Sequence, residues 1–114
     1  MQYTPHVGGS ILNSAIALGR LGADAYYCGA VSNDTYGHLI EDCLRGSKVQ
    51  EDFIIKTNRH TTLAYADVTN AVAKYTFVDE HSAGRLIDEN SLKSFVNKIK
   101  NAKALMVGGI SLQA

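Results

Sequence analysis

The sequence predicts an α/β fold in which helices flank a mostly parallel β-sheet and a small antiparallel β lid projects from it. Strand-like and helix-like patterns alternate through the first half of the chain, which favours parallel strands joined by helical crossovers. The middle of the chain holds strand-like segments with almost no helical signal between them. Near the end, the apolar run 104–107 stops at two glycines, as a central parallel strand does where it meets a ligand crevice.

The first predicted helix follows two adjacent glycines, residues 8–9. Apolar side chains recur at helical spacing over residues 11–21, and Gly22 is placed to end the helix. Ser10 is the expected N-cap. Glycine is costly inside a helix, so Gly19 predicts close packing against another backbone.

A buried strand and a second helix are predicted next. Residues 25–31 are rich in apolar and aromatic side chains, as a buried strand is. Over residues 36–44 the apolar side chains follow the i, i+3, i+4, i+7 spacing of an amphipathic helix, which ends at 45–46. Either Asn33 or Asp34 is expected to cap this helix.

The remaining elements are three strands and one helix. The strands are predicted at 53–55, 61–69 and 72–78, and the last two are close enough to form a hairpin around Asn70. After a polar loop, Asp88 is expected to cap a third helix with a single apolar stripe.

Composition excludes several classes of function. The 114 residues have a formal net charge of +0 and spread-out basic residues, so no nucleic-acid partner is expected. No apolar run approaches the length of a membrane span, which predicts no membrane partner and a cytoplasmic location. The two cysteines, Cys28 and Cys43, are expected to be buried reduced thiols, and the four histidines lack metal-ligand spacing.

A ligand site is predicted at the start of the first helix. Gly8 and Gly9 carry no Cβ, so the main chain there allows a close approach to a ligand beside the free N–H groups of the helix. Asn13 adds an amide with two donors and an acceptor, which suits hydroxyl groups. The residues alone leave a blander alternative open, in which the glycines form a tight turn and Asn13 is an exposed polar side chain.

Several short motifs, in order, resemble one known family. They are Gly8-Gly9 with Asn13, Gly29 with Asn33-Asp34 and Gly37, Thr61-Thr62, Tyr75-Thr76-Phe77 followed by Glu80 and Ser82-Ala83, and Val107-Gly108-Gly109-Ile110-Ser111. Together they resemble the N-terminal part of the ribokinase-like sugar kinases, the PfkB carbohydrate kinase family, and in particular its fructokinase-like members. The resemblance implies a partial ribokinase-like, Rossmann-like fold.

The resemblance also implies which residues bind substrate. In this family the glycine turn and the signature asparagine hold the sugar, which assigns Gly8, Gly9 and Asn13 to substrate binding. The strand with Tyr75 and Phe77 corresponds to a wall over the sugar, although alternating aromatic residues in a strand are more often core.

One position departs from the family pattern. Asp79 stands where relatives that act on keto-acid sugars carry an arginine that faces the substrate carboxylate. A carboxylate there would repel an acidic sugar, which favours a neutral one. Asp79 and Glu80 are otherwise expected to form a solvated turn rather than an acid/base pair.

The family's catalytic turn, Gly-Ala-Gly-Asp, does not occur in these residues, and no P-loop does either. Residues 1–114 are therefore expected to be an incomplete PfkB-type domain that carries the sugar-binding part and lacks the catalytic and ATP-binding half. No catalytic residue, cofactor ligand or metal ligand is assigned within it. ATP and Mg²⁺ are expected for a full-length enzyme, and the isolated piece is expected to be inactive.

The resulting hypothesis is that these residues form the substrate-binding part of an ATP-dependent kinase, which phosphorylates a hydroxyl of a neutral sugar such as fructose. A nucleoside (adenosine-type) kinase of the same fold and a non-catalytic sugar-binding relative remain alternatives. Outside this family, the helix start could bind another anion or a dinucleotide, although no GxGxxG follows a strand. The expected partners are a small sugar and a second copy of the chain, paired through the β lid.

Overall fold

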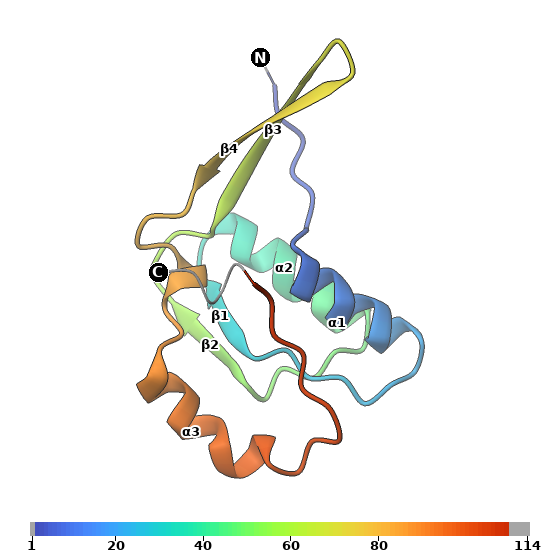
Figure 1. Ribbon diagram of the computed structural model, residues 1–114, viewed down its shortest axis with the longest axis vertical. Coiled ribbons are helices and arrows are strands. Elements are labelled where there is room, and N and C mark those ends of the chain that lie inside the picture. Colours follow the sequence, from blue (N-terminus) through green and yellow to red (C-terminus); the bar gives the residue numbers. More distant parts are fainter. Residues whose placement is uncertain (1, 110–114) are drawn as a thin grey trace.

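The computed structural model describes residues 2–109 and has the predicted α/β architecture (Figure 1). A parallel pair of strands, β1 (Gly29–Ser32) and β2 (Ile54–Thr57), lies beside the helices, and an antiparallel hairpin projects from this body. The other elements are α1 (Ser10–Arg20), α2 (Thr35–Gly46), β3 (Leu63–Thr69), β4 (Val72–Val78), the short 3₁₀ helix η1 (Ala83–Arg85) and α3 (Glu89–Ile99). Ile110 and Ser111 of the last family motif lie outside the described residues.

Helix α1 is capped differently from the prediction. Its N-cap is Gly9, with φ 102°, and Ser10 is the first helical residue, so the expected Ser10 cap is wrong. Glycine tolerates this positive φ because it has no Cβ, and it therefore takes the capping position without a side-chain bond. The last helical residue is Arg20, and Gly22, the residue predicted to end the helix, follows the Leu21 C-cap with φ 88° and donates its N–H to the Gly19 carbonyl.

Close packing explains Gly19, as predicted. A Cβ there would collide with the Ser47 carbonyl oxygen, so the backbone of α1 lies directly against the turn that follows α2. The core between the two helices contains Leu12, Ala15, Leu44 and Val49. Leu44 has no exposed surface, and burial of such a side chain contributes roughly 1.5–3 kcal/mol.

The cap of α2 is Asp34, which decides between the two candidates from the sequence. Its Oδ1 accepts a hydrogen bond of 2.8 Å from the Gly37 N–H, whereas the Asn33 amide donates to Asn58 instead. Asp88 caps α3 in the same way, through the Ser91 N–H at 2.9 Å. Both carboxylates satisfy first-turn donors that have no partner within the helix.

The predicted hairpin around Asn70 is confirmed. Strands β3 and β4 pair from Leu63 with Val78 to Thr69 with Val72, and the two turn residues, Asn70 and Ala71, both have positive φ. This geometry matches a two-residue turn that follows the twist of the strands. The hairpin projects away from the helices (Figure 1).

Because of this projection, the two aromatic side chains of β4 do not form core. Tyr75 and Phe77 are 62% and 63% exposed and stack on each other with ring centroids 6.3 Å apart. The interpretation as core is therefore wrong for this structure.

Two other strand predictions change. The run 104–107 is not a strand in the described structure, and its three large apolar side chains, Leu105, Met106 and Val107, are 65%, 62% and 58% exposed. A strand needs a neighbour to satisfy its backbone groups, and no strand of the described region pairs with this run. The predicted strand 25–31 is regular from Gly29, preceded by a single bridge from Tyr26 to Gln50.

Candidate functional site

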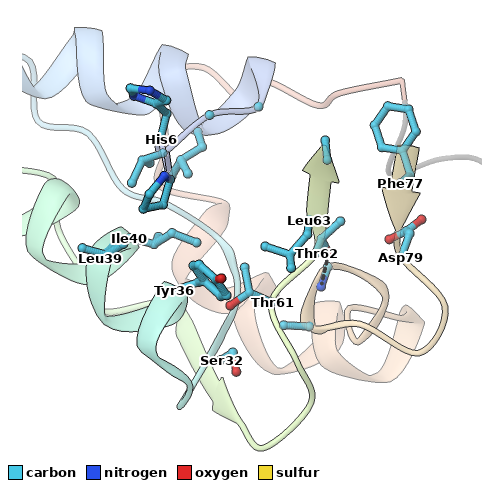
Figure 2. Close-up of a pocket in the computed structure, with 18 of the residues that line it drawn as sticks. His6, Ser32, Tyr36, Leu39, Ile40, Thr61, Thr62, Leu63, Phe77 and Asp79 are labelled. Atoms are coloured by element: carbon cyan, nitrogen blue, oxygen red, sulfur yellow. Dashed lines mark hydrogen bonds between the residues drawn. The ribbon is translucent and has the colours of Figure 1, made fainter. Parts of the chain in front are cut away.

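A cleft of about 800 Å³ opens where the N-terminal segment, α2, the hairpin base and η1 meet. In the view of Figure 2, Leu39 and Ile40 of α2 lie on one side, Phe77 and Asp79 on the other, and Thr61 between them. The lining residues are 2–12, Tyr27, 30–32, Tyr36, 39–40, 61–66, Phe77, Asp79, 83–85 and Gly108. The volume falls within the range of small-molecule sites, about 300–1,000 Å³.

The glycine turn lies on this cleft. Gly8 and Gly9 both line it, and no heavy atom lies within 4 Å of the place where a Cβ would stand on either residue. The adjoining N–H groups belong to the first turn of α1, where peptide dipoles favour oxygen-rich ligands. The backbone is therefore open to a ligand at this point.

The structure brings together only some of the predicted site residues. Phe77 lines the cleft with the two glycines, whereas Asn13 and Tyr75 are exposed and stand outside the described lining. Tyr75 lies on the same face of β4 as Phe77, two residues further from the cleft. The binding roles of Gly8, Gly9, Asn13, Tyr75 and Phe77 stay predictions.

Asp34 joins the start of α2 to the edge of the cleft. Its Oδ1 also accepts from the Thr61 hydroxyl at 2.6 Å, and its Oδ2 accepts from the Thr61 N–H at 2.9 Å. Partial burial acts to raise the pKa of Asp34, but the hydrogen bonds from Thr61 and Gly37 outweigh it and hold the pKa below its ordinary value. Asp34 thereby positions Thr61, a buried residue that lines the cleft.

A second carboxylate, Asp79, forms an ion pair at the hairpin base. Its Oδ2 accepts from Arg85 Nε at 2.7 Å and lies 2.6 Å from Arg85 Nη2, while its Oδ1 accepts from the Ser82 hydroxyl at 3.0 Å. The bond from Arg85 is the main reason that the pKa of Asp79 lies below its ordinary value. Asp79 is thus neither a solvated turn residue nor half of an acid/base pair with Glu80.

This pairing also corrects the argument from charge repulsion. Arg85 compensates the charge of Asp79, so this carboxylate does not by itself oppose an acidic ligand. The sequence offered no signal for the pair beyond two opposite charges six positions apart.

The ring of His60 connects the two ends of the hairpin. Its Nδ1 lies 2.9 Å from the Thr61 carbonyl oxygen and its Nε2 lies 3.0 Å from the Glu80 carbonyl oxygen. Both partners only accept, so both bonds form at once only when both ring nitrogens carry a proton. These bonds, to Thr61 first and then to Glu80, raise the pKa of His60.

The described lining of the cleft combines residues that carry hydroxyl groups with aromatic residues. Hydroxyl groups of Ser32, Thr61 and Thr62 and the aromatic rings of Tyr36 and Phe77 line it, a combination that suits a small polar molecule with apolar faces. Asp79 is the one carboxylate among the described lining residues, and Arg85 and Ser82 already engage both of its oxygens.

The described region offers neither a membrane-spanning helix nor a metal-binding cluster. None of its helices is long and apolar enough to span a bilayer, and the cytoplasmic location stays a prediction. Residues 2–109 contain no group of three or more His, Cys, Asp or Glu side chains arranged to hold a metal ion.

Comparison with known proteins gives consistent matches. Residues 1–114 match the family described as pfkB family carbohydrate kinase. The chain is 36% identical over 110 residues to a fructokinase of Rhizobium leguminosarum bv. trifolii and 31% identical over 107 residues to a probable chloroplastic fructokinase-6 of Arabidopsis thaliana. These alignments cover 96% and 92% of this chain but 33% and 27% of the relatives, so the chain spans about a third of their length or less.

A solved structure of Xylella fastidiosa fructokinase with bound ATP resembles much of this chain. It superposes with a TM-score of 0.69 at 26% identity, over 77% of this chain and 29% of that one. The similarity confirms the α/β fold class that the sequence predicts.

Proposed function

Because the chain belongs to the pfkB family of carbohydrate kinases, we propose that it is the substrate-binding part of an ATP-dependent sugar kinase. The proposed reaction transfers the γ-phosphoryl group of ATP to a hydroxyl of a neutral sugar such as fructose. One observation carries the proposal: the Gly8-Gly9 turn, at the amino end of α1, lies open on a cleft with the dimensions of a small-molecule site.

The residues of this chain would bind and orient the sugar. The backbone at Gly8 and Gly9 would meet the sugar hydroxyls, and Asn13 would contribute its amide from the next turn of α1. Phe77, with Tyr75 beyond it, would cover an apolar face of the sugar and exclude water. Holding one hydroxyl in a constant position lowers the entropic cost of its reaction with a phosphoryl donor.

The chemistry is proposed to lie elsewhere in the enzyme. ATP would supply the phosphoryl group, and Mg²⁺ would offset the charge that develops during its transfer. We assign no catalytic base to this chain, since the oxygens of Asp79 are already engaged. Residues 1–114 would accordingly be an incomplete PfkB-type domain, inactive when isolated.

A homodimer through the hairpin is also proposed. The hairpin presents several exposed apolar side chains, which favours pairing with a second copy. They are Val68, Val72, Tyr75, Phe77 and Val78. Sedimentation of the protein and of a Val68→Lys variant tests this, because a charge on the hairpin is expected to shift the population toward monomer.

The decisive experiment is an acceptor panel. Protein expressed from the natural reading frame is assayed with ATP and neutral sugars, sugar acids or nucleosides, and turnover of a neutral sugar is expected. Preferential turnover of nucleosides would replace the proposal with the nucleoside kinase alternative. Saturable sugar binding without turnover would favour a non-catalytic relative.

A parallel assay of the isolated 114 residues tests whether these residues bind the sugar without catalysing its phosphorylation. We expect no phosphoryl transfer from this piece, and sustained turnover by it would contradict the assignment of catalysis to another part of the enzyme.

A further inference from the structure

We propose that the hydroxyl group of Tyr36 hydrogen-bonds one hydroxyl of the bound sugar and so fixes how the sugar lies in the cleft. The inference rests on the proposed sugar kinase function and adds a specificity-determining residue to the same site. It starts from the apolar stripe of α2, whose first turn does not belong to the core.

The surroundings of this stripe change along the helix. Leu44, about two turns after Tyr36, has no exposed surface and belongs to the core between the helices. Tyr36 and Leu39 are 42% and 40% exposed, and both line the cleft together with the half-buried Ile40. The stripe therefore leaves the core at the start of α2 and becomes a wall of the cleft.

This wall carries one polar group at its tip. Tyr36, Leu39 and Ile40 share a helix face because residues three and four positions apart are neighbours on a helix. The side chains of Leu39 and Ile40 are hydrocarbon, so the Tyr36 hydroxyl is the one hydrogen-bonding group among these three side chains. Small-molecule sites typically combine apolar surface with a few polar groups that fix the orientation of the ligand.

The Tyr36 hydroxyl is available to a ligand. In the described part of the chain no residue forms a hydrogen bond with it. The nearby hydroxyls are already engaged, because Thr61 donates to Asp34 Oδ1 at 2.6 Å and Ser32 accepts from the Asp34 N–H at 3.0 Å. A phenol hydroxyl both donates and accepts, so it can pair with a sugar hydroxyl in either role.

The backbone that carries Tyr36 is held on both sides. Before it, Asp34 caps the helix and binds Thr61 through both carboxylate oxygens. After it, a Cβ on Gly37 would collide with the Ser32 carbonyl, so the start of α2 lies directly against the end of β1. A tyrosine on a fixed backbone has only two side-chain torsions left to order when a ligand binds.

Phe77 gives the cleft a second aromatic ring on another side. In the view of Figure 2, Tyr36 lies on the α2 side of Thr61 and Phe77 on the hairpin side. A ring without polar atoms can only cover an apolar face of a sugar, whereas a tyrosine adds a hydroxyl to the same kind of surface. Tyr36 is therefore expected to distinguish sugars by the presence of one particular hydroxyl group.

The test compares Tyr36→Phe, which removes only the hydroxyl, with the wild type. Calorimetry measures the Kd of fructose and of analogues that each lack one hydroxyl group, with the protein from its natural reading frame. We expect Tyr36→Phe to raise the Kd of fructose about three- to tenfold, the range for one neutral hydrogen bond. For the analogue that lacks the partner hydroxyl, the two proteins should bind equally well.

Tyr26→Phe is the matched control. Tyr26 is also 42% exposed, but its ring packs against Phe53 and lies outside the described lining of the cleft. Its replacement removes the same atom from a similarly exposed tyrosine, so the Kd of fructose should stay unchanged.

The outcomes separate this inference from the proposed function. If the wild-type protein neither binds nor phosphorylates a sugar, the proposed function fails. If it phosphorylates fructose but Tyr36→Phe binds fructose as tightly as the wild type, the inference alone is overturned. An equal loss for fructose and for every analogue also overturns it, because the hydroxyl would then act on the protein and not on the sugar. Should Tyr36→Phe not fold, the wild type decides, since equal affinity for fructose and every analogue would leave Tyr36 no sugar hydroxyl to bind.

Discussion

Asp34→Ala tests whether one carboxylate both begins a helix and shapes the cleft. Losing the cap on the Gly37 N–H costs about 1 kcal/mol. The change also removes both acceptors for Thr61, which is 7% exposed, and an unsatisfied buried polar group costs about 1–3 kcal/mol. The expected loss in free energy of unfolding is therefore roughly 2–4 kcal/mol.

Asp88→Ala is the matched control, because the described hydrogen bonds to the Asp88 carboxylate come from its own first turn, chiefly from the Ser91 N–H and hydroxyl, and none comes from a distant segment. It should cost about 1 kcal/mol. Urea unfolding followed by circular dichroism compares the two variants, and hydrogen exchange at the Thr61 amide should accelerate only in Asp34→Ala. Equal losses in the two variants, with unchanged exchange at Thr61, would refute the idea that Asp34 holds the cleft edge.

Three further predictions follow from the same contacts. Gly9→Ala and Gly22→Ala both place a Cβ on a residue with positive φ, so each should lower the free energy of unfolding by about 1 kcal/mol or more. Only Gly9→Ala should weaken sugar binding measured by calorimetry, because Gly9 lines the cleft and Gly22 does not. The pKa of His60 is raised, so its contribution to stability is complete below the ordinary value of 6.5 and is lost as pH rises through the folded value. An NMR titration should therefore show a raised pKa for the His60 ring, and hydrogen exchange at the Ala83 amide, which donates to the His60 carbonyl, should accelerate as the ring loses its proton. Exchange at Ala83 that slows with rising pH, after correction for intrinsic rates, would contradict this prediction. Asn13→Ala should raise the KM for the sugar without changing stability, since Asn13 is exposed, and unchanged kinetics would remove Asn13 from the site.

Features that depend on neighbouring residues could be predicted from the sequence. The helices follow from apolar spacing, Asp88 and Gly22 mark helix ends, and Asn70 marks the hairpin turn. The family was identified from short motifs in order, because the glycine turn, the strand ends and the hairpin each leave a local signature. The prediction of Ser10 as the N-cap was wrong because Gly9, with φ 102°, occupies the capping position and Ser10 is already helical.

The amino-acid sequence by itself thus determined the three helices, the β3–β4 hairpin, the α/β class and the family, since these depend mainly on interactions within a few residues. Only the tertiary structure decided the partners of Asp34, His60 and Asp79. It also decided the exposure of Tyr75 and the lack of a strand at 104–107 in the described region. A side chain's partner depends on how distant elements are brought together, and a strand exists only where another strand satisfies its backbone groups.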